Sequence, residues 1–173
     1  PKIEQSINGF IDVVWIETFQ NNKGLFYKKI DSFGNTEIKM KRLTVVERIT
    51  RFDMAVSSSG QLHLVFDDNR YHDHKMDVIY TKLSSTGTTI IDDLLITKRG
   101  DDNNSFSPSL SMDERDDMYI CWADSRDYQK VVSNDTTIEK TPHDIYVKKL
   151  DSDGNFLRDS VRLTGNISYS FKP

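Results

Sequence analysis

The chain of 173 residues has a single cysteine, Cys121, so it cannot form an internal disulfide, and this thiol is predicted to be buried and unreactive. No apolar run approaches the roughly 18 residues that a membrane-spanning helix needs. The sequence also lacks a basic excess, because its net charge is -4 with both signs interspersed. A nucleic-acid-binding surface would need a basic stripe, so the composition argues against nucleic acid as a partner.

The sequence instead contains three copies of one pattern, each of about fifty residues. In each copy a turn residue lies six positions before an aromatic residue, and an acidic residue lies two positions after that aromatic. Further along, a threonine lies ten positions after a glycine. The corresponding residues are Gly9, Trp15 and Glu17; Gly60, Phe66 and Asp68; and Asp116, Trp122 and Asp124, followed by Gly34 and Thr44, Gly87 and Thr97, and Gly154 and Thr164.

Each copy has the alternation of β-strands. Met118, Ile120 and Trp122 share one face of a strand, and Tyr119 and Cys121 share the other. Both faces are partly apolar, which suits a sheet buried between neighbouring sheets. The repeated glycines are placed for tight hairpins that need positive φ. We therefore predict a four-stranded antiparallel meander in each copy, with strand A near 52–57 and 108–113, strand B near 61–67 and 117–123, strand C near 77–83 and 144–150, and strand D near 89–96 and 156–163.

Tandem four-stranded meanders are typical of β-propeller blades, here predicted at about 1–48, 49–104 and 105–173. Trp122-Ala123-Asp124-Ser125-Arg126, Asp144-Ile145-Tyr146 and Phe66-Asp67-Asp68-Asn69-Arg70 resemble the sialidase-like, Asp-box-related group of propeller repeats. The resemblance implies an all-β propeller and an extracellular or cell-surface location. It does not extend to sialidase activity, because Ser107 and Lys172 stand where that family places its first arginine.

The ends of the chain fall at one phase of the repeat. Ser105-Phe106-Ser107-Pro108 opens the third strand A, and the last residues, Ser170–Pro173, have the same pattern and should open a fourth. Propellers typically have four to eight blades, so three cannot close a ring. We expect either two chains that complete a six-bladed ring as a homodimer, or a fragment of a larger propeller.

One end of each predicted blade carries the irregular, polar connections. These are the B–C loops at 17–24, 68–77 and 124–143 and the D–A loops at about 44–51, 97–107 and 164–171. Loops held on a rigid scaffold often carry binding residues, so this loop face is the predicted binding face. Its candidate ligand-binding residues are Asp68, Arg70, Tyr71, Asp124, Arg126 and Tyr128.

The recurrence of Asp68 with Arg70 and of Asp124 with Arg126 favours a structural role, in which each Asp accepts backbone N–H groups and pairs with its own Arg. His72, Asp73 and His74 are the nearest approach to a metal site, but successive loop residues point apart, so neither a metal nor a cofactor is predicted. Asp151-Ser152-Asp153-Gly154-Asn155 resembles the start of a calcium loop and is interpreted as a hairpin turn. We assign no catalytic residue.

The sequence favours a non-catalytic propeller module that binds a protein or a glycan through its loop face. One alternative is a glycoside hydrolase or lyase of the sialidase-like group, with part of its active site in missing blades. Another is a structural cell-surface repeat. Glycan binding predicts exposed aromatic residues on the loop face, whereas an enzyme predicts carboxylates that converge in the central channel.

Overall fold

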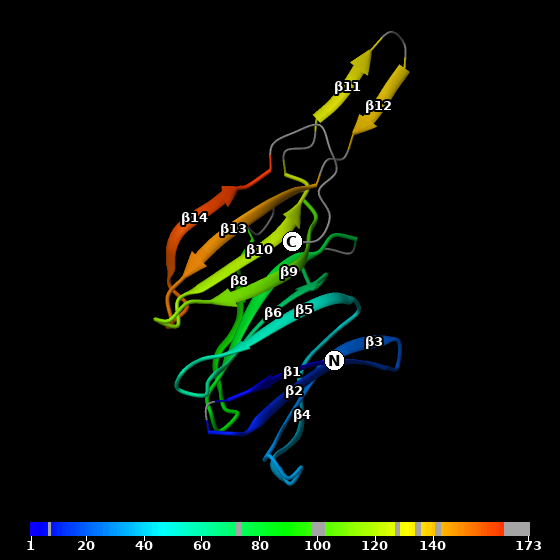
Figure 1. Cartoon of the computed structure of the whole chain (residues 1–173). Coiled ribbons are helices and arrows are strands. Elements are labelled where there is room, and N and C mark those ends of the chain that lie inside the picture. Colours follow the sequence, from blue (N-terminus) through cyan, green and yellow to red (C-terminus); the bar gives the residue numbers. More distant parts are fainter. Residues whose placement is uncertain are drawn as a thin grey trace.

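The computed structural model describes residues 1–6, 8–71, 74–97, 103–126, 129–133, 136–140 and 143–164, with the backbone alone in 129–133 and 136–140. The strands of these residues form three four-stranded antiparallel sheets and one separate two-stranded hairpin, which confirms the predicted all-β fold (Figure 1). The described residues include no helix that is long and apolar enough to cross a membrane.

Each sheet is a meander of strands paired in chain order. The first contains β1 (Lys2–Gln5), β2 (Ile11–Phe19), β3 (Asn22–Ile30) and β4 (Thr36–Val46). The second contains β5 (Ile49–Val56), β6 (Leu62–Asp68), β7 (Asp77–Leu83) and β8 (Thr89–Leu95). The third contains β9 (Ser105–Met112), β10 (Met118–Asp124), β13 (Asp144–Leu150) and β14 (Phe156–Arg162), and a separate hairpin of β11 (Gln129–Ser133) and β12 (Thr136–Lys140) lies between β10 and β13 in the sequence.

The second sheet is covered on both faces. Leu64 and Phe66 of β6 belong to a hydrophobic cluster that includes Val14 of the first sheet. Val65, which lies between them, belongs to a second cluster with Trp122 of the third sheet. Successive side chains of a strand point to opposite faces, so the alternation in the sequence correctly predicted a sheet buried between two others. Strand β5 contacts both β1 and β9, and Figure 1 shows the sheets stacked in chain order, as β-propeller blades are.

A lysine links each sheet to the next. Lys29 of β3 donates to the Ser85 carbonyl at 3.1 Å, and Lys82 of β7 donates to the Ser152 carbonyl at 2.6 Å. Both lysines are almost fully buried, and both acceptors lie in the turn between the last two strands of the following sheet. Lys149 occupies the same position in β13, where its side chain is 29% exposed and pairs with aspartates of its own sheet.

The three turn glycines have the predicted positive φ, at 87° for Gly34, 78° for Gly87 and 85° for Gly154. Two of them also allow close packing. A Cβ on Gly154 would lie 2.6 Å from Ile91 Cδ1 of the preceding sheet, and one on Gly87 would lie 2.9 Å from Ile38 Cδ1. Nothing lies within 4 Å of a Cβ on Gly34. The turns of the second and third sheets therefore need glycine both for conformation and for space.

Three of the predicted loops differ from the structure. Strands β2 and β3 stay paired as far as Phe19 and Asn22, so the loop expected at 17–24 is a two-residue turn of Gln20 and Asn21. Both turn residues have positive φ, 47° and 67°, as type I′ hairpins require. The expected loop at 124–143 contains the β11–β12 hairpin. The D–A connection expected at 44–51 shortens to residues 47–48, because β4 and β5 extend into it.

Cys121 is only half-buried, which corrects the prediction of a buried thiol. It lies on the face of β10 opposite Trp122, and therefore away from the second sheet. Tyr119 on the same face is 39% exposed. Partial burial raises the pKa of the Cys121 thiol, which keeps the group protonated and poorly nucleophilic.

His63 is a buried titratable group between the second and third sheets. It is fully buried, and its Nδ1 lies 2.8 Å from the Tyr80 hydroxyl and 3.0 Å from Met118 Sδ. Burial, together with the nearby charge of Lys82, lowers the pKa of His63 from 6.5 to about 4 against the smaller opposing effect of Asp116. The imidazole is therefore neutral in the folded protein.

We expect stability to fall on mild acidification because of His63. The unfolded chain takes up the imidazole proton near pH 6.5 and the folded chain only near pH 4, so this contribution is complete above pH 6.5 and is lost as the pH falls toward 4. The loss should reach roughly 3 kcal/mol. Urea unfolding at intervals between pH 7.5 and 4 measures it. A His63→Gln variant should show a shallower dependence over that range, and equal slopes would contradict the assignment.

Candidate functional site

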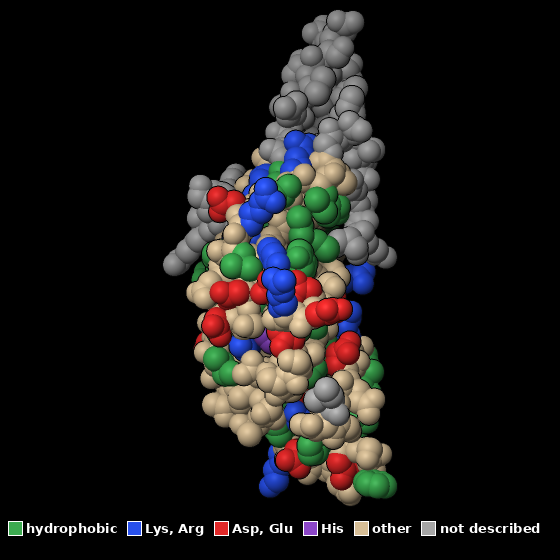
Figure 2. All heavy atoms as spheres, turned by 60° about the vertical axis from the view of Figure 1, so that its left-hand side comes forward, with side chains coloured by type: hydrophobic (Ala, Val, Ile, Leu, Met, Phe, Trp, Pro, Cys, Tyr) green, Lys and Arg blue, Asp and Glu red, His purple; other side chains and the backbone are tan. Residues whose placement is uncertain are grey.

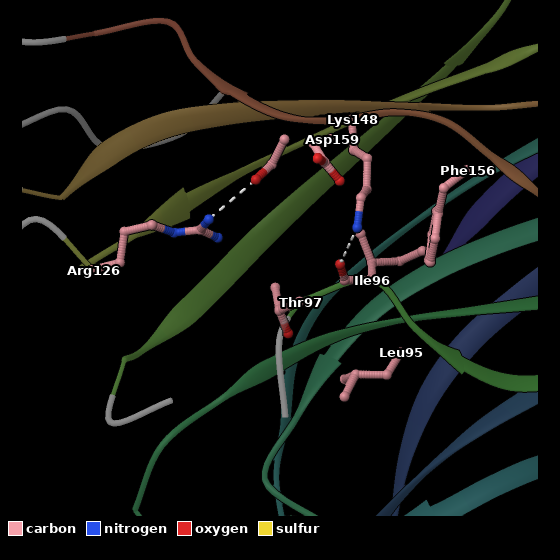
Figure 3. A pocket seen from close by; sticks show the side chains of 8 residues that line it. Leu95, Ile96, Thr97, Arg126, Lys148, Phe156 and Asp159 are labelled. Carbon is pink, nitrogen blue, oxygen red and sulfur yellow. Dashed lines mark hydrogen bonds between the residues drawn. The ribbon is translucent and has the colours of Figure 1, made fainter. Parts of the chain in front are cut away.

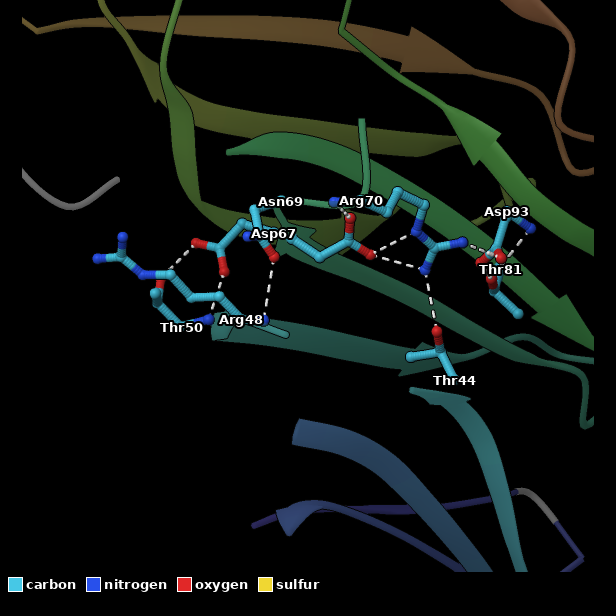
Figure 4. A network of polar contacts seen from close by, with 9 residues as sticks. Thr44, Arg48, Thr50, Asp67, Asn69, Arg70, Thr81 and Asp93 are labelled. Atoms are coloured by element: carbon cyan, nitrogen blue, oxygen red, sulfur yellow. Dashed lines mark hydrogen bonds and ion pairs between the residues drawn. The ribbon is translucent and has the colours of Figure 1, made fainter. Parts of the chain in front are cut away.

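Asp68 and Arg70 form an ion pair at the end of β6. Asp68 Oδ1 accepts the Arg70 backbone N–H at 3.0 Å, and Oδ2 lies 2.7 Å from Arg70 Nε and 2.6 Å from Nη2. Arg70 continues across the interface between the first and second sheets, where it pairs with Asp93 of β8 and donates to Thr44 Oγ1 at 2.9 Å (Figure 4). The contacts expected of a structural pair are present here.

Asp124 and Arg126 repeat this arrangement at the end of β10. Asp124 Oδ1 accepts the Arg126 backbone N–H at 2.9 Å, and Oδ2 lies 2.7 Å from Arg126 Nη2. Two further donors reach Asp124 Oδ2, the Trp122 indole at 2.8 Å and the Ser105 hydroxyl at 2.9 Å. The Arg126 guanidinium also lies over the Tyr146 ring, 4.1 Å from its centroid.

The two aspartates differ in pKa because their neighbours differ. Burial raises the pKa of Asp68, and the pairing with Arg70 offsets this effect only in part. Burial acts in the same direction on Asp124, but hydrogen bonds from Arg126 and Trp122 outweigh it and hold the pKa of that carboxyl below its usual value. The second copy has Phe66 in place of tryptophan, so Asp68 receives no indole N–H.

The repeated threonines join the last strand of a sheet to the strand before it. Thr97 Oγ1 donates to Asp77 at 2.9 Å, and Thr164 Oγ1 donates to Asp144 at 2.8 Å. In the first copy a glycine, Gly24, replaces the aspartate. The corresponding hydroxyl, on Thr44, instead accepts from Arg70 of the second sheet. Thr44 and Thr97 therefore have different partners at the two interfaces between sheets.

A cavity of about 300 Å³ lies between the second and third sheets. The second sheet contributes the last residues of its outer strand, and the third contributes Arg126 and residues of β13 and β14. Figure 3 shows Arg126 and Lys148 entering the cavity from two sides. The lining residues are Leu95, Ile96, Thr97, Arg126, Lys148, Phe156, Asp159 and Ser160.

The polar groups of the cavity carry charges of both signs, with two cations. Lys148 Nζ donates to the Ile96 carbonyl at 3.0 Å and lies 3.8 Å from the centroid of the Phe156 ring. Burial lowers the pKa of Lys148, the charge of Asp159 raises it, and the charge of Arg126 lowers it further. Arg126 Nη1 donates to Ser160 Oγ at 3.1 Å. On the face seen in Figure 2, basic and acidic side chains lie intermixed, so individual residues set the local charge.

Of the other predicted candidates that the structure describes, Tyr71 and His74 are not among the lining residues of this cavity. Tyr71, expected to be an exposed aromatic, is half-buried against the first hydrophobic cluster. Tyr128, His72 and Asp73 lie outside the described residues, and His74 is exposed. Within the described ranges no three His, Cys, Asp or Glu side chains form a group that could hold a metal ion.

The calcium-like turn is a hairpin turn, as predicted. Asp151 Oδ1 accepts the backbone N–H groups of Asp153 at 2.9 Å and Asn155 at 2.8 Å, and Oδ2 accepts the Asn155 side-chain amide at 2.9 Å. Asp31 and Asn35 make the same contacts in the first sheet. Both carboxylate oxygens of the turn aspartate are therefore engaged within the hairpin, Oδ1 by backbone N–H groups and Oδ2 by the asparagine side chain.

Asp67 accepts hydrogen bonds from residues of two sheets, and the sequence analysis did not identify it. Its buried carboxylate accepts the backbone N–H groups of Thr50 and Arg51, both at 2.8 Å, and the Thr50 hydroxyl at 2.7 Å (Figure 4). It also accepts the Ser107 N–H of the third sheet at 2.9 Å. The pairing of β5 with β6 is interrupted between Ile49 and Phe52, so Asp67 satisfies the N–H groups that the bulge leaves unpaired.

No protein-family model and no curated protein sequence matches this chain. Solved structures do. An endo-arabinase from Bacteroides thetaiotaomicron aligns over 95% of the chain with a TM-score of 0.54 and 12% identity. A GH93 α-L-arabinofuranosidase of Fusarium graminearum, in complex with arabinobiose, aligns over 89% with a TM-score of 0.59 and 9% identity. A PL25 ulvan lyase bound to -[GlcA(1-4)Rha3S]- aligns over 90% with a TM-score of 0.56 and 13% identity.

The aligned part of the chain spans 61%, 44% and 41% of the lengths of these three structures. Similarity at such low identity shows the fold alone. The chain therefore has the sheet architecture of a β-propeller and corresponds to part of a longer structure in each comparison.

Proposed function

We propose that this chain is part of a carbohydrate-binding β-propeller, and that the cavity between the second and third sheets is one of its sugar-binding sites. The observation that carries the proposal is the lining of this cavity. Phe156 offers a ring that is 46% exposed, and Arg126, Lys148 and Asp159 offer polar groups around it. Sugars present apolar C–H faces and hydroxyl edges, so such a site suits them. Its volume lies at the lower end of the range of ligand pockets.

The similar structures support the proposal, because two of them hold sugars. These are the arabinobiose complex of the arabinofuranosidase and the ulvan lyase with its glucuronate-containing ligand. The resemblance of the sequence to sialidase-like repeats points to the same broad group of glycan-related propellers.

A glycan-cleaving enzyme is the second candidate, favoured by the enzymatic activities named for the similar structures. Glycoside hydrolysis needs two suitably spaced carboxyl groups that can reach the substrate. Three carboxylates at strand ends, Asp67, Asp68 and Asp124, already accept hydrogen bonds from backbone N–H groups, and Asp68 and Asp124 also pair with arginine. These contacts favour binding over cleavage. Release of reducing ends from arabinan or a uronate polymer would favour the enzyme.

We expect Phe156→Ala to weaken sugar binding about tenfold, because the ring would otherwise cover one face of the bound sugar. Isothermal titration of the chain with a panel of oligosaccharides measures the affinity. Phe33→Ala is the matched control, since Phe33 lies in the corresponding turn region of the first sheet and is 90% exposed. Equal affinity of the two variants for every bound sugar would contradict the placement of the site. Absence of binding to the whole panel would contradict the proposed function.

A further inference from the structure

We infer that the cavity between the second and third sheets selects acidic sugars, whose carboxylate is bound by Arg126 and Lys148. This inference rests on the proposed carbohydrate-binding function and specifies its ligand class. It comes from a comparison within the chain, because the corresponding position between the first and second sheets has a carboxylate where this one has a hydroxyl.

Between the first and second sheets, the arginine reaches protein partners on both sides. Arg70 pairs with Asp68 behind it and with Asp93 of β8, and it donates to Thr44 of the first sheet. Asp93 in turn accepts a hydrogen bond from Thr81 at 3.3 Å. The carboxylate of Asp93 thus lies between the arginine and the residue at the middle of β7.

Between the second and third sheets, the corresponding residues are different. Ser160 takes the place of Asp93, and Lys148 takes the place of Thr81. The threonine of the preceding sheet, Thr97, is engaged by Asp77. A carboxylate has been replaced by a hydroxyl and a neutral side chain by a cation, and the cavity lies beside both replacements.

The charges of the two interfaces therefore differ at this position. The charges of Asp159 and Arg126 both act on Lys148, that of Asp159 the more strongly, and the side chain of Asp159 is exposed to solvent. A ligand carboxylate in the cavity would take the role that Asp93 has beside Arg70. Arginine binds carboxylates with two parallel hydrogen bonds, and a lysine ammonium adds a point charge.

The ligand is a sugar acid rather than a free anion because of the aromatic ring. Phe156 lines the same cavity, and Lys148 lies against one face of its ring. A uronic acid carries a ring and a carboxylate in one residue, so it can engage Phe156 and the two cations together. Free sulfate or phosphate would use the cations alone.

Four probes test the inference by isothermal titration of the full chain: trigalacturonate, its methyl ester, neutral arabinotriose and sodium sulfate. We expect trigalacturonate to bind at least about tenfold more tightly than its ester. Equal binding of the acid and the ester would overturn the selectivity and leave the carbohydrate-binding proposal intact. Binding of sulfate as tight as that of trigalacturonate would overturn the sugar acid in favour of a simple anion site. No binding of any sugar would overturn both proposals.

A substitution that copies the other interface tests the location. Ser160→Asp should pair with Arg126 as Asp93 pairs with Arg70, and should weaken trigalacturonate binding about tenfold or more while the unfolding temperature is kept or raised. The reverse exchange, Asp93→Ser, should leave the affinity unchanged. Lys148→Gln should weaken the binding of trigalacturonate but not that of its methyl ester. A merely structural role of Lys148 would not distinguish the two ligands. Full affinity in both Ser160→Asp and Lys148→Gln would place the site elsewhere.

Discussion

Replacement of Asp67 by alanine should lower the free energy of unfolding by about 4 kcal/mol, because the backbone N–H groups of three residues and one hydroxyl would lose their acceptor. The Ser107 N–H is one of them, and Ser107 has a positive φ of 54°, which this contact helps to hold. The substitution would also separate the bulge in β5 from the start of β9. Urea unfolding at pH 7 measures the change.

Two further variants make the Asp67 experiment specific. Asp67→Asn keeps one acceptor oxygen of similar shape, so it should lose about half of the stability that alanine loses. Asp92→Ala removes an exposed aspartate of β8 and should change the free energy of unfolding by less than about 0.5 kcal/mol. If alanine and asparagine at position 67 had the same small effect, the carboxylate would not be the element that holds the two strands.

Gly154→Val should lower the free energy of unfolding by about 4 kcal/mol, through backbone strain and overpacking together. The residue has a φ of 85°, which a β-branched side chain strongly disfavours. Its side chain would also meet Ile91 Cδ1, which lies 2.6 Å from the Cβ position, and the Tyr80 ring. Thermal and chemical unfolding, compared with the unsubstituted chain, measure the loss.

Gly34→Val separates the two causes. Gly34 has nearly the same φ, 87°, but nothing lies within 4 Å of its Cβ position. Its loss should therefore be about 2 kcal/mol, the cost of backbone strain without the clash. A combined variant of Gly154→Val with Ile91→Ala should recover part of the difference. Identical losses at both glycines would mean that close packing between the second and third sheets contributes nothing at this turn.

Local sequence signals predicted most of the fold. The alternation of Met118, Ile120 and Trp122 with Tyr119 and Cys121 located β10 to within a residue, since the side-chain period of a strand is two. The glycines of the hairpin turns were found for the same kind of reason, because few other residues adopt positive φ. The β2–β3 turn was missed because its two positive-φ residues are Gln20 and Asn21, which give a weaker signal than glycine.

The candidate site could be predicted only in part, because it depends on contacts between side chains of different sheets. The recurrence of Asp68 and Asp124 predicted their pairing with arginine, which the contacts confirm. The same recurrence concealed Asp67, which has Ala123 at the matching position of the third copy and therefore appeared to be a variable residue. Likewise, Asp93 and Ser160 occupy matching positions, and the importance of this difference can be recognised only in the structure, where each contacts an arginine.

Because the second sheet is covered on both faces, the stability of the whole chain depends on that sheet. Each hydrophobic cluster takes residues from the second sheet, so its unfolding would remove both clusters at once. Detachment of the first or third sheet would remove one cluster and leave the other. In an array whose members contact only their neighbours, cooperativity is carried by such shared interfaces. The second sheet is thus the unit through which a disturbance at one end reaches the other, and the proposed carbohydrate site lies on one of its two borders.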